Sequence, residues 1–222
     1  MTPSEASAPR LALVCGLLLA LIALLILAPP SATARSIATV LTAAGVVTAV
    51  WAARVGRRFL LGVSAIVALA TVASVTAAAV DARTSETADT VILTILVVAV
   101  PFAILVGLRG ERTISIQAVF GAIAIYLVLG LMFALFMTLT ARFSSQPYFA
   151  QGTDGSLSQR VYFSYVTLAT LGYGDLTPAT GVGRLLAVAE SIIGNLYLVT
   201  AVSLVVSRIG QTNRRAGRGD AG

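Results

Sequence analysis

Six long apolar segments, each bounded by charged residues or by Pro and Gly, dominate this sequence of 222 residues. Their lengths suit helices that cross ~30 Å of hydrocarbon, which takes about 20 residues each. The composition agrees, because 58% of the residues are hydrophobic and only 11% are charged. The sequence therefore predicts an all-α integral membrane protein with six transmembrane helices. These helices are expected at residues 11–28, 36–53, 59–80, 91–108, 114–140 and 182–208.

The arginines set the expected orientation in the membrane. All 15 basic residues are arginines, and they lie at segment ends, which favours an orienting role over nucleic-acid binding. With a cytoplasmic N-terminus, the inner side holds Arg10, Arg54, Arg57, Arg58, Arg109, Arg112, Arg208, Arg214, Arg215 and Arg218. The outer side holds Arg35, Arg83, Arg142, Arg160 and Arg184. This excess inside predicts a multi-pass protein of the cell membrane with both termini in the cytoplasm.

One alternative concerns the N-terminus. Arg10, the apolar run 11–28 and the small residues Ala32, Thr33 and Ala34 could form a cleaved signal peptide. The apolar run is longer than the ~7–15 residues usual for such a signal, which favours a retained helix. Cleavage would leave the orientation of the later segments unchanged.

A polar interval separates the last two apolar segments. Residues 141–160 carry no transmembrane signal and predict an extracellular loop. Residues 158–169 then predict a helix too short to span the bilayer, which indicates a re-entrant helix surrounded by protein or water. The C-terminal end of that helix carries partial negative charge and would point toward an ion path.

The run 170–175, with the sequence TLGYGD, carries the most specific chemistry in the chain. A potassium ion that crosses a membrane must exchange its water shell for other oxygens, and backbone carbonyls supply them in potassium channels. Gly172 and Gly174 can take positive φ at little cost, which lets successive carbonyls point the same way. Thr170 can add a hydroxyl oxygen at the inner end. The pattern predicts an ion-selective filter rather than a simple tight turn.

Residues 113–209 resemble the pore domain of tetrameric potassium channels. The stretch 162–178 is similar to that family's pore helix, filter and exit, and residues 183–187 with Gly194 resemble the start and hinge of its inner helix. The resemblance covers a little under half of the chain. It implies a homotetramer around one potassium-selective pore, with K+ and the lipid bilayer as partners and no cofactor besides the permeant ion.

The resemblance also implies which residues bind the ion. It assigns ion binding to the backbone of Thr170, Leu171, Gly172, Tyr173 and Gly174. The carbonyls up to Tyr173 would be the direct K+ ligands. Leu171 stands where the family often has Val, and its side chain would face away from the ion.

Filter support is expected from residues on both sides of the filter, namely Tyr162, Thr167, Asp175 and Glu190. Asp175 would concentrate cations or bond to Tyr162 behind the filter, and a solvated turn carboxylate is the alternative. In the inner helix, the expected cavity and gate residues are Gly194, Asn195, Leu198, Val202 and Val206. Gly194 would either bend this helix or let it pack closely on the pore helix. Helix–helix packing is also the alternative for the three apolar cavity residues.

Glu190 is the only acidic residue deep within a predicted spanning helix, where an isolated charge is costly. Five residues separate it from Asn195, about 140° around a helix of 3.6 residues per turn. If Asn195 faces the cavity, Glu190 faces the back of the pore helix or a neighbouring subunit, near the hydroxyls of Tyr165 and Thr167. The sequence predicts a structural brace, protonated or hydrogen-bonded. A cavity-facing and a lipid-facing carboxylate are the alternatives.

Residues 1–112 are predicted to form a four-helix transmembrane domain that serves as a scaffold around the pore domain, 113–209, and lipid or tension sensing is an alternative role. Voltage sensing needs several arginines on the fourth segment, because moving one charge gains only ~2.3 kcal/mol per 100 mV. Residues 91–108 contain no charge, so we expect a scaffold and no steep voltage gating. The remaining stretch, 210–222, is polar and predicts a disordered cytoplasmic tail.

The sequence thus predicts passive, potassium-selective conduction. A weakly selective cation channel and a non-conducting regulatory subunit are alternatives. A potassium transporter subunit is a third, although those carry four filter-like repeats on one chain and this chain has one. The chain has no histidine and no recognisable set of nucleophile, base and oxyanion donors, so an enzyme is not expected. Its single cysteine, Cys15, excludes an intrachain disulfide or a cysteine-based metal cluster.

Overall fold

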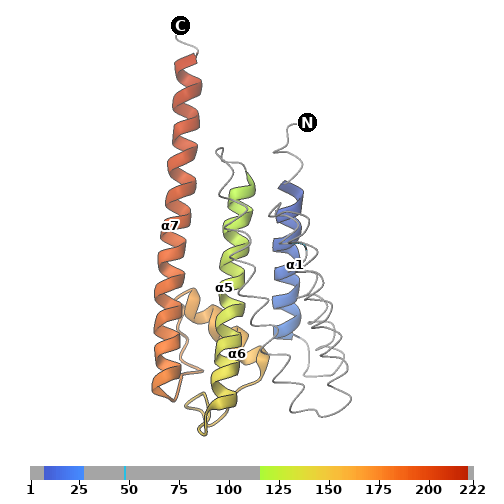
Figure 1. Ribbon diagram of the computed structural model, residues 1–222, viewed down its shortest axis with the longest axis vertical. Coiled ribbons are helices and arrows are strands. Elements are labelled where there is room, and N and C mark those ends of the chain that lie inside the picture. Colours follow the sequence, from blue (N-terminus) through green and yellow to red (C-terminus); the bar gives the residue numbers. More distant parts are fainter. Residues whose placement is uncertain (1–7, 28–47, 49–115, 220–222) are drawn as a thin grey trace, which may run out of the picture.

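The computed structural model describes residues 8–27, 48 and 116–219 of the chain (Figure 1). The named elements are the helices α1 (Ala8–Leu27), α5 (Ile116–Phe143), α6 (Leu157–Leu168) and α7 (Gly181–Gly219). Beyond these helices, extended pairing in the described ranges is limited to isolated bridges that involve Phe149. The all-α prediction is therefore confirmed for the part of the chain that the structure describes.

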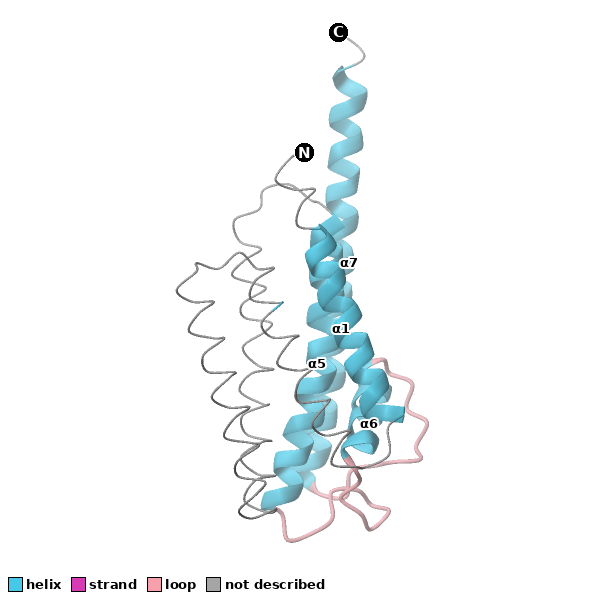
Figure 2. Cartoon of the chain, turned by 90° about the vertical axis from the view of Figure 1, so that its right-hand side faces the viewer, coloured by secondary structure: helices cyan, strands magenta, loops and turns pink. Residues whose placement is uncertain are grey.

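Three of the helices are long and lie side by side, and the short α6 packs against them near one end (Figures 1 and 2). The α1 and α5 helices run in the same direction. Cys15 near the start of α1 contacts the carbonyl of Phe120 near the start of α5, and Ser158 of α6 contacts the carbonyl of Ile26 near the end of α1. The α7 helix runs the opposite way, so the described chain ends, Ala8 and Gly219, lie toward the same end (Figure 1).

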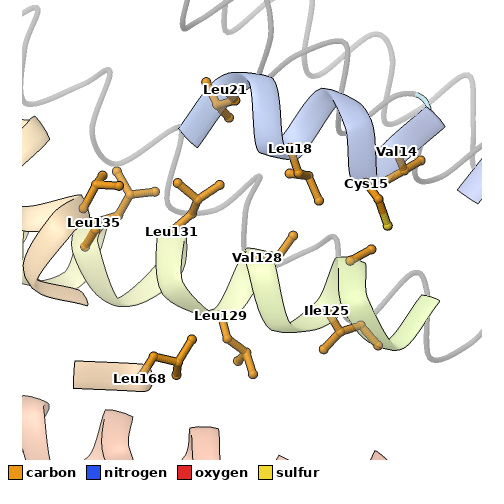
Figure 3. Close-up of a cluster of buried hydrophobic side chains, with 13 residues drawn as sticks. Val14, Cys15, Leu18, Leu21, Ile125, Val128, Leu129, Leu131, Leu135 and Leu168 are labelled. Atoms are coloured by element: carbon orange, nitrogen blue, oxygen red, sulfur yellow. The ribbon is translucent and has the colours of Figure 1, made fainter. Parts of the chain in front are cut away.

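Close packing of apolar side chains joins α1 to α5. Leu18 of α1 lies between the two helices near Val128, and Leu168 at the end of α6 approaches another side of α5 beside Leu129 (Figure 3). Lipid tails are as apolar as leucine, so van der Waals packing rather than escape from water holds such helices together in a bilayer. Residues 8–27 therefore lie against the predicted pore domain itself, through contacts with both α5 and α6.

Two helices in the described residues are long and apolar enough to cross a membrane, over Val119–Phe143 and Gly181–Ala201. The α1 helix contains a shorter apolar stretch, Ala12–Leu27. The predicted segments 59–80 and 91–108, and 36–53 apart from Thr48, lie outside the described residues.

The C-terminal end of α7 differs from the prediction. We expected a disordered tail from residue 210, but the helix continues to Gly219 and spans 39 residues, or about 58 Å at 1.5 Å per residue. Extending an existing helix costs little once it is nucleated, because each further residue gains one hydrogen bond. Residues 210–219 contain no proline that would stop this propagation.

Candidate functional site

The short helix α6 begins at a well-defined cap. Ser156 and Gln159 form a reciprocal capping box, in which the Gln159 amide donates to the Ser156 hydroxyl and the Ser156 amide donates to the Gln159 side chain. The helix has 12 residues, about 18 Å, so it cannot cross the bilayer. It ends at Leu168, next to the predicted filter.

The backbone of the predicted filter alternates in the sign of φ. Thr170, Gly172 and Gly174 have positive φ values of 57°, 56° and 81°, whereas the intervening Leu171 and Tyr173 do not. Alternation of this kind lets successive carbonyls project toward one side, as ion coordination requires. The glycine positions agree with the sequence analysis. Positive φ at Thr170 was not anticipated, because this conformation costs a non-glycine residue roughly 1–2 kcal/mol.

The first two filter residues are tied to the end of α6. The amide of Thr170 donates to the carbonyl of Thr167 at 3.0 Å, and that of Leu171 to the carbonyl of Val166 at 2.9 Å. The side chains of Leu171 and Tyr173 are 57% and 66% exposed in the single chain. One chain therefore leaves the filter open on its sides.

The loop before α6 is hydrogen-bonded to the segment that follows the predicted filter, a contact that the sequence did not predict. The amide of Ala150 donates to the carbonyl of Thr177, and the amide of Ala179 donates to the carbonyl of Tyr148, both at 2.8 Å. Phe149 packs edge-to-face against Tyr148 and against Phe163 of α6. Burial raises the pKa of the Tyr148 phenol, so this side chain stays neutral at physiological pH. The predicted extracellular loop is thus a packed structure.

Two of the predicted support residues meet behind the filter. The phenol of Tyr162 interacts with the carboxyl group of Asp175. This interaction supports the predicted pairing of Asp175 with Tyr162. Thr167 contributes its backbone carbonyl to Thr170, as described above.

Glu190 is fully buried, with 0% of its surface exposed, and faces α6. The expected partners were wrong. Its Oε1 atom lies within hydrogen-bond distance of the Ser164 hydroxyl, whereas the Tyr165 hydroxyl donates instead to the carbonyl of Leu127 in α5. The same Ser164 oxygen lies 2.6 Å from the carbonyl of Gly130. Ser164 thus stands where α5, α6 and α7 meet.

Gly194 lies against the end of α6. A Cβ atom at this position would come within 2.6 Å of Leu168 Cδ1 and 3.1 Å of the Leu168 carbonyl oxygen. This contact supports the packing alternative for Gly194. Asn195 and Leu198 are exposed in the single chain. Val202 and Val206 lie in α7, but their side-chain surroundings fall outside the described part of the structure.

A row of large apolar side chains on α7 is uncovered in the single chain. Its members recur at the three- and four-residue spacing of one helix face, and they are Leu185, Val188, Ile192, Leu196 and Val199. Such a face must be covered by lipid or by protein in a membrane.

Comparison with known proteins identifies the region that contains this site. Residues 119–211 match a family model described as ion channel. No match to a solved structure was found.

Several curated relatives share the same region. A putative potassium channel protein of Rhodopseudomonas palustris is 31% identical over 37% of this chain and 20% of its own length. The two pore potassium channel c of Oryza sativa subsp. japonica is 33% identical over 38% of this chain and 17% of its own. The inward rectifier potassium channel Kirbac3.1 of Paramagnetospirillum magnetotacticum is 33% identical over 38% and 27%. The chain thus spans well under half of the length of each of these three relatives. Residues 119–211 thus form an ion channel region, and this region is similar to the potassium channels named here.

Proposed function

We propose that this protein is a potassium-selective channel that conducts K+ passively across the cell membrane. The observation that carries the proposal is the alternating backbone of residues 170–174, held between the end of α6 and the clamped exit. Backbone carbonyls presented in this way can replace the hydration shell of K+. The carbonyls of Thr170, Leu171, Gly172 and Tyr173 would be the ligands, and Asn195 with Leu198 would line the inner cavity. The names of the relatives support K+ as the permeant ion.

A homotetramer follows from the same geometry. One chain supplies one strand of carbonyls, and a coordination cage needs several such strands around an axis. The exposed filter side chains, Leu171 and Tyr173, and the uncovered apolar row on α7 are the surfaces that neighbouring subunits would cover.

The topology of six crossings is part of the proposal. The α1 and α5 helices run in the same direction, which supports an odd number of membrane crossings between them. The three apolar segments predicted at 36–53, 59–80 and 91–108 would meet this requirement. Both termini would then lie in the cytoplasm, and the polar loop of residues 144–156 would be extracellular. Because segment 91–108 contains no charge, conduction should not depend steeply on voltage.

Selectivity is tested by reversal potentials of the purified protein in lipid bilayers. With K+ and Na+ gradients varied independently, we expect the reversal potential to follow the K+ gradient. Equal permeation by both ions would favour the weakly selective cation channel. Protein that folds and reconstitutes but carries no ion flux would favour the regulatory subunit.

Subunit number is tested by native mass measurement in detergent. We expect a mass of four protomers, since one strand of carbonyls per chain cannot enclose an ion. A conducting monomer or dimer would contradict this expectation.

A further inference from the structure

The hydroxyl of Ser164 touches two oxygens that both compete for its single proton. The backbone carbonyl of Gly130 lies at 2.6 Å and can only accept a hydrogen bond, and Glu190 Oε1 is the second neighbour. An ionised carboxylate can also only accept. With Glu190 ionised, one of the two close contacts would therefore be a repulsive meeting of oxygen lone pairs. Both contacts become hydrogen bonds when Glu190 itself supplies a proton.

The second carboxyl oxygen of Glu190 also indicates that the side chain is protonated. Glu190 Oε2 is buried and has no hydrogen-bond partner among the described residues. An ionised carboxylate spreads its charge over both oxygens, and leaving one of them buried without a donor is costly. In a neutral carboxylic acid this oxygen is an uncharged carbonyl, which is far cheaper to bury.

The described titratable groups that interact with Glu190 carry no compensating positive charge. The titratable groups on which a charge at Glu190 would act are phenols, namely Tyr126 of α5, Tyr165 of α6 and Tyr148 of the extracellular loop. None of these carries positive charge in either protonation state. Among the described residues, the side chain that hydrogen-bonds to the Glu190 carboxyl group is that of Ser164.

We propose that Glu190 is a neutral carboxylic acid that donates its proton to Ser164, which donates in turn to the carbonyl of Gly130. This two-step hydrogen-bond relay links α7 to α5 through the middle of α6. Ser164 stands six residues before Thr170, the first filter residue, so the relay fixes α6 and thereby the filter. Glu190 and Ser164 act here as positioning residues and not as ion ligands. The effect on conduction rests on the proposed channel function, whereas the protonation state does not.

The relay is tested by three variants. They distinguish the effect of a hydrogen-bond donor at residue 190 from the effect of a side chain that only fills the space there. Glu190→Gln keeps a neutral donor for Ser164 and cannot ionise. Glu190→Leu removes the donor but keeps a side chain of similar size, and Ser164→Ala removes the middle of the relay. The full-length protein is measured in each case.

Stability of the folded protein against pH gives the first readout. We expect the wild type to lose heat resistance as pH rises above neutrality, because withdrawal of the proton breaks the first step of the relay. Glu190→Gln should match the wild type at neutral pH, within about twofold in the rate of thermal inactivation, and should not respond to alkali. Glu190→Leu and Ser164→Ala should raise that rate about tenfold or more, as expected for a lost buried hydrogen bond.

Infrared spectroscopy gives a second readout that does not depend on ion flux. A protonated carboxylic acid has a C=O stretch that a carboxylate lacks. This band should be present in the wild type at neutral pH, absent from Glu190→Gln and shifted in Ser164→Ala. A neutral-pH spectrum in which Glu190→Gln removes carboxylate absorption instead, or a Gln variant as unstable as the Leu variant, would overturn the relay. Both readouts stand even if the protein proves not to conduct K+.

Discussion

Replacing Gly174 with Ala is expected to abolish K+-selective flux in reconstituted protein. Gly174 has φ of 81°, and a Cβ atom added there would meet nothing within 4 Å, so the change acts only through the backbone. An L-residue in this conformation costs roughly 1–2 kcal/mol, and each subunit of a symmetric assembly would bear that cost. Relaxing to negative φ would turn the neighbouring carbonyl away from the pore axis. Gly172, with φ of 56° and equally open space, should behave in the same way.

The extracellular loop offers a matched control for this prediction. Gly152 has φ of 77° and also has no atom within 4 Å of an added Cβ, but it lies outside the filter. Gly152→Ala should therefore carry a similar backbone cost and keep K+ selectivity. The measurement is K+ and Na+ flux from liposomes at equal amounts of folded protein. If Gly174→Ala and Gly152→Ala conduct equally well, residues 170–174 are not the selectivity filter.

Local sequence patterns located the pore elements well. The apolar run 114–140 and the short helix 158–169 correspond to α5 and α6, with bounds shifted by no more than three residues. These elements are set by length, apolar content and a capping residue, all of which are local. The glycine positions of the filter were predictable for the same reason, because φ preference is a property of the single residue.

Contacts between distant residues were not predictable in this way. Ser164 meets Gly130 and Glu190 at separations of 34 and 26 residues, which no local pattern records. Helical spacing predicted that Glu190 lies behind the pore helix, but it could not predict which hydroxyl group there would be its hydrogen-bond partner. One signal was available: Ser164 lies with Val161 and Leu168 on the face of α6 that becomes buried, so its hydroxyl needed a partner.

The strained backbone at Thr170 is a second feature that could not be predicted from the sequence. The φ preferences of single residues would place only glycine at positive φ. Thr170 nevertheless takes this conformation at the start of the predicted filter. A residue keeps such a strained conformation only where contacts with its surroundings hold the backbone in place. Here the amides of Thr170 and Leu171 are both bonded to the end of α6, which holds the turn in place.

Replacing Gly130 with Ala is expected to destabilise the packing of α5 against α6. A Cβ atom at this position would lie 2.5 Å from Cε1 and 2.6 Å from Cζ of the Tyr165 ring, well inside van der Waals contact. The ring cannot easily retreat, because the Tyr165 hydroxyl is bonded to the carbonyl of Leu127. Overpacking of this kind costs typically ~1–3 kcal/mol in one chain. The loss should appear as a lower yield of folded protein and a lower temperature of thermal inactivation.

Gly16 in α1 provides the control, since it is also a helical glycine but has nothing within 4 Å of an added Cβ. Gly16→Ala should leave stability unchanged or raise it by up to ~1 kcal/mol, because alanine loses less backbone entropy in a helix. A double variant then identifies the cause. If the overlap with Tyr165 is responsible, Gly130→Ala should be less harmful when combined with Tyr165→Ala, so the two changes are not additive. Additive losses would instead mean that Gly130 acts through α5 alone and that the close approach of α6 is not what requires glycine there.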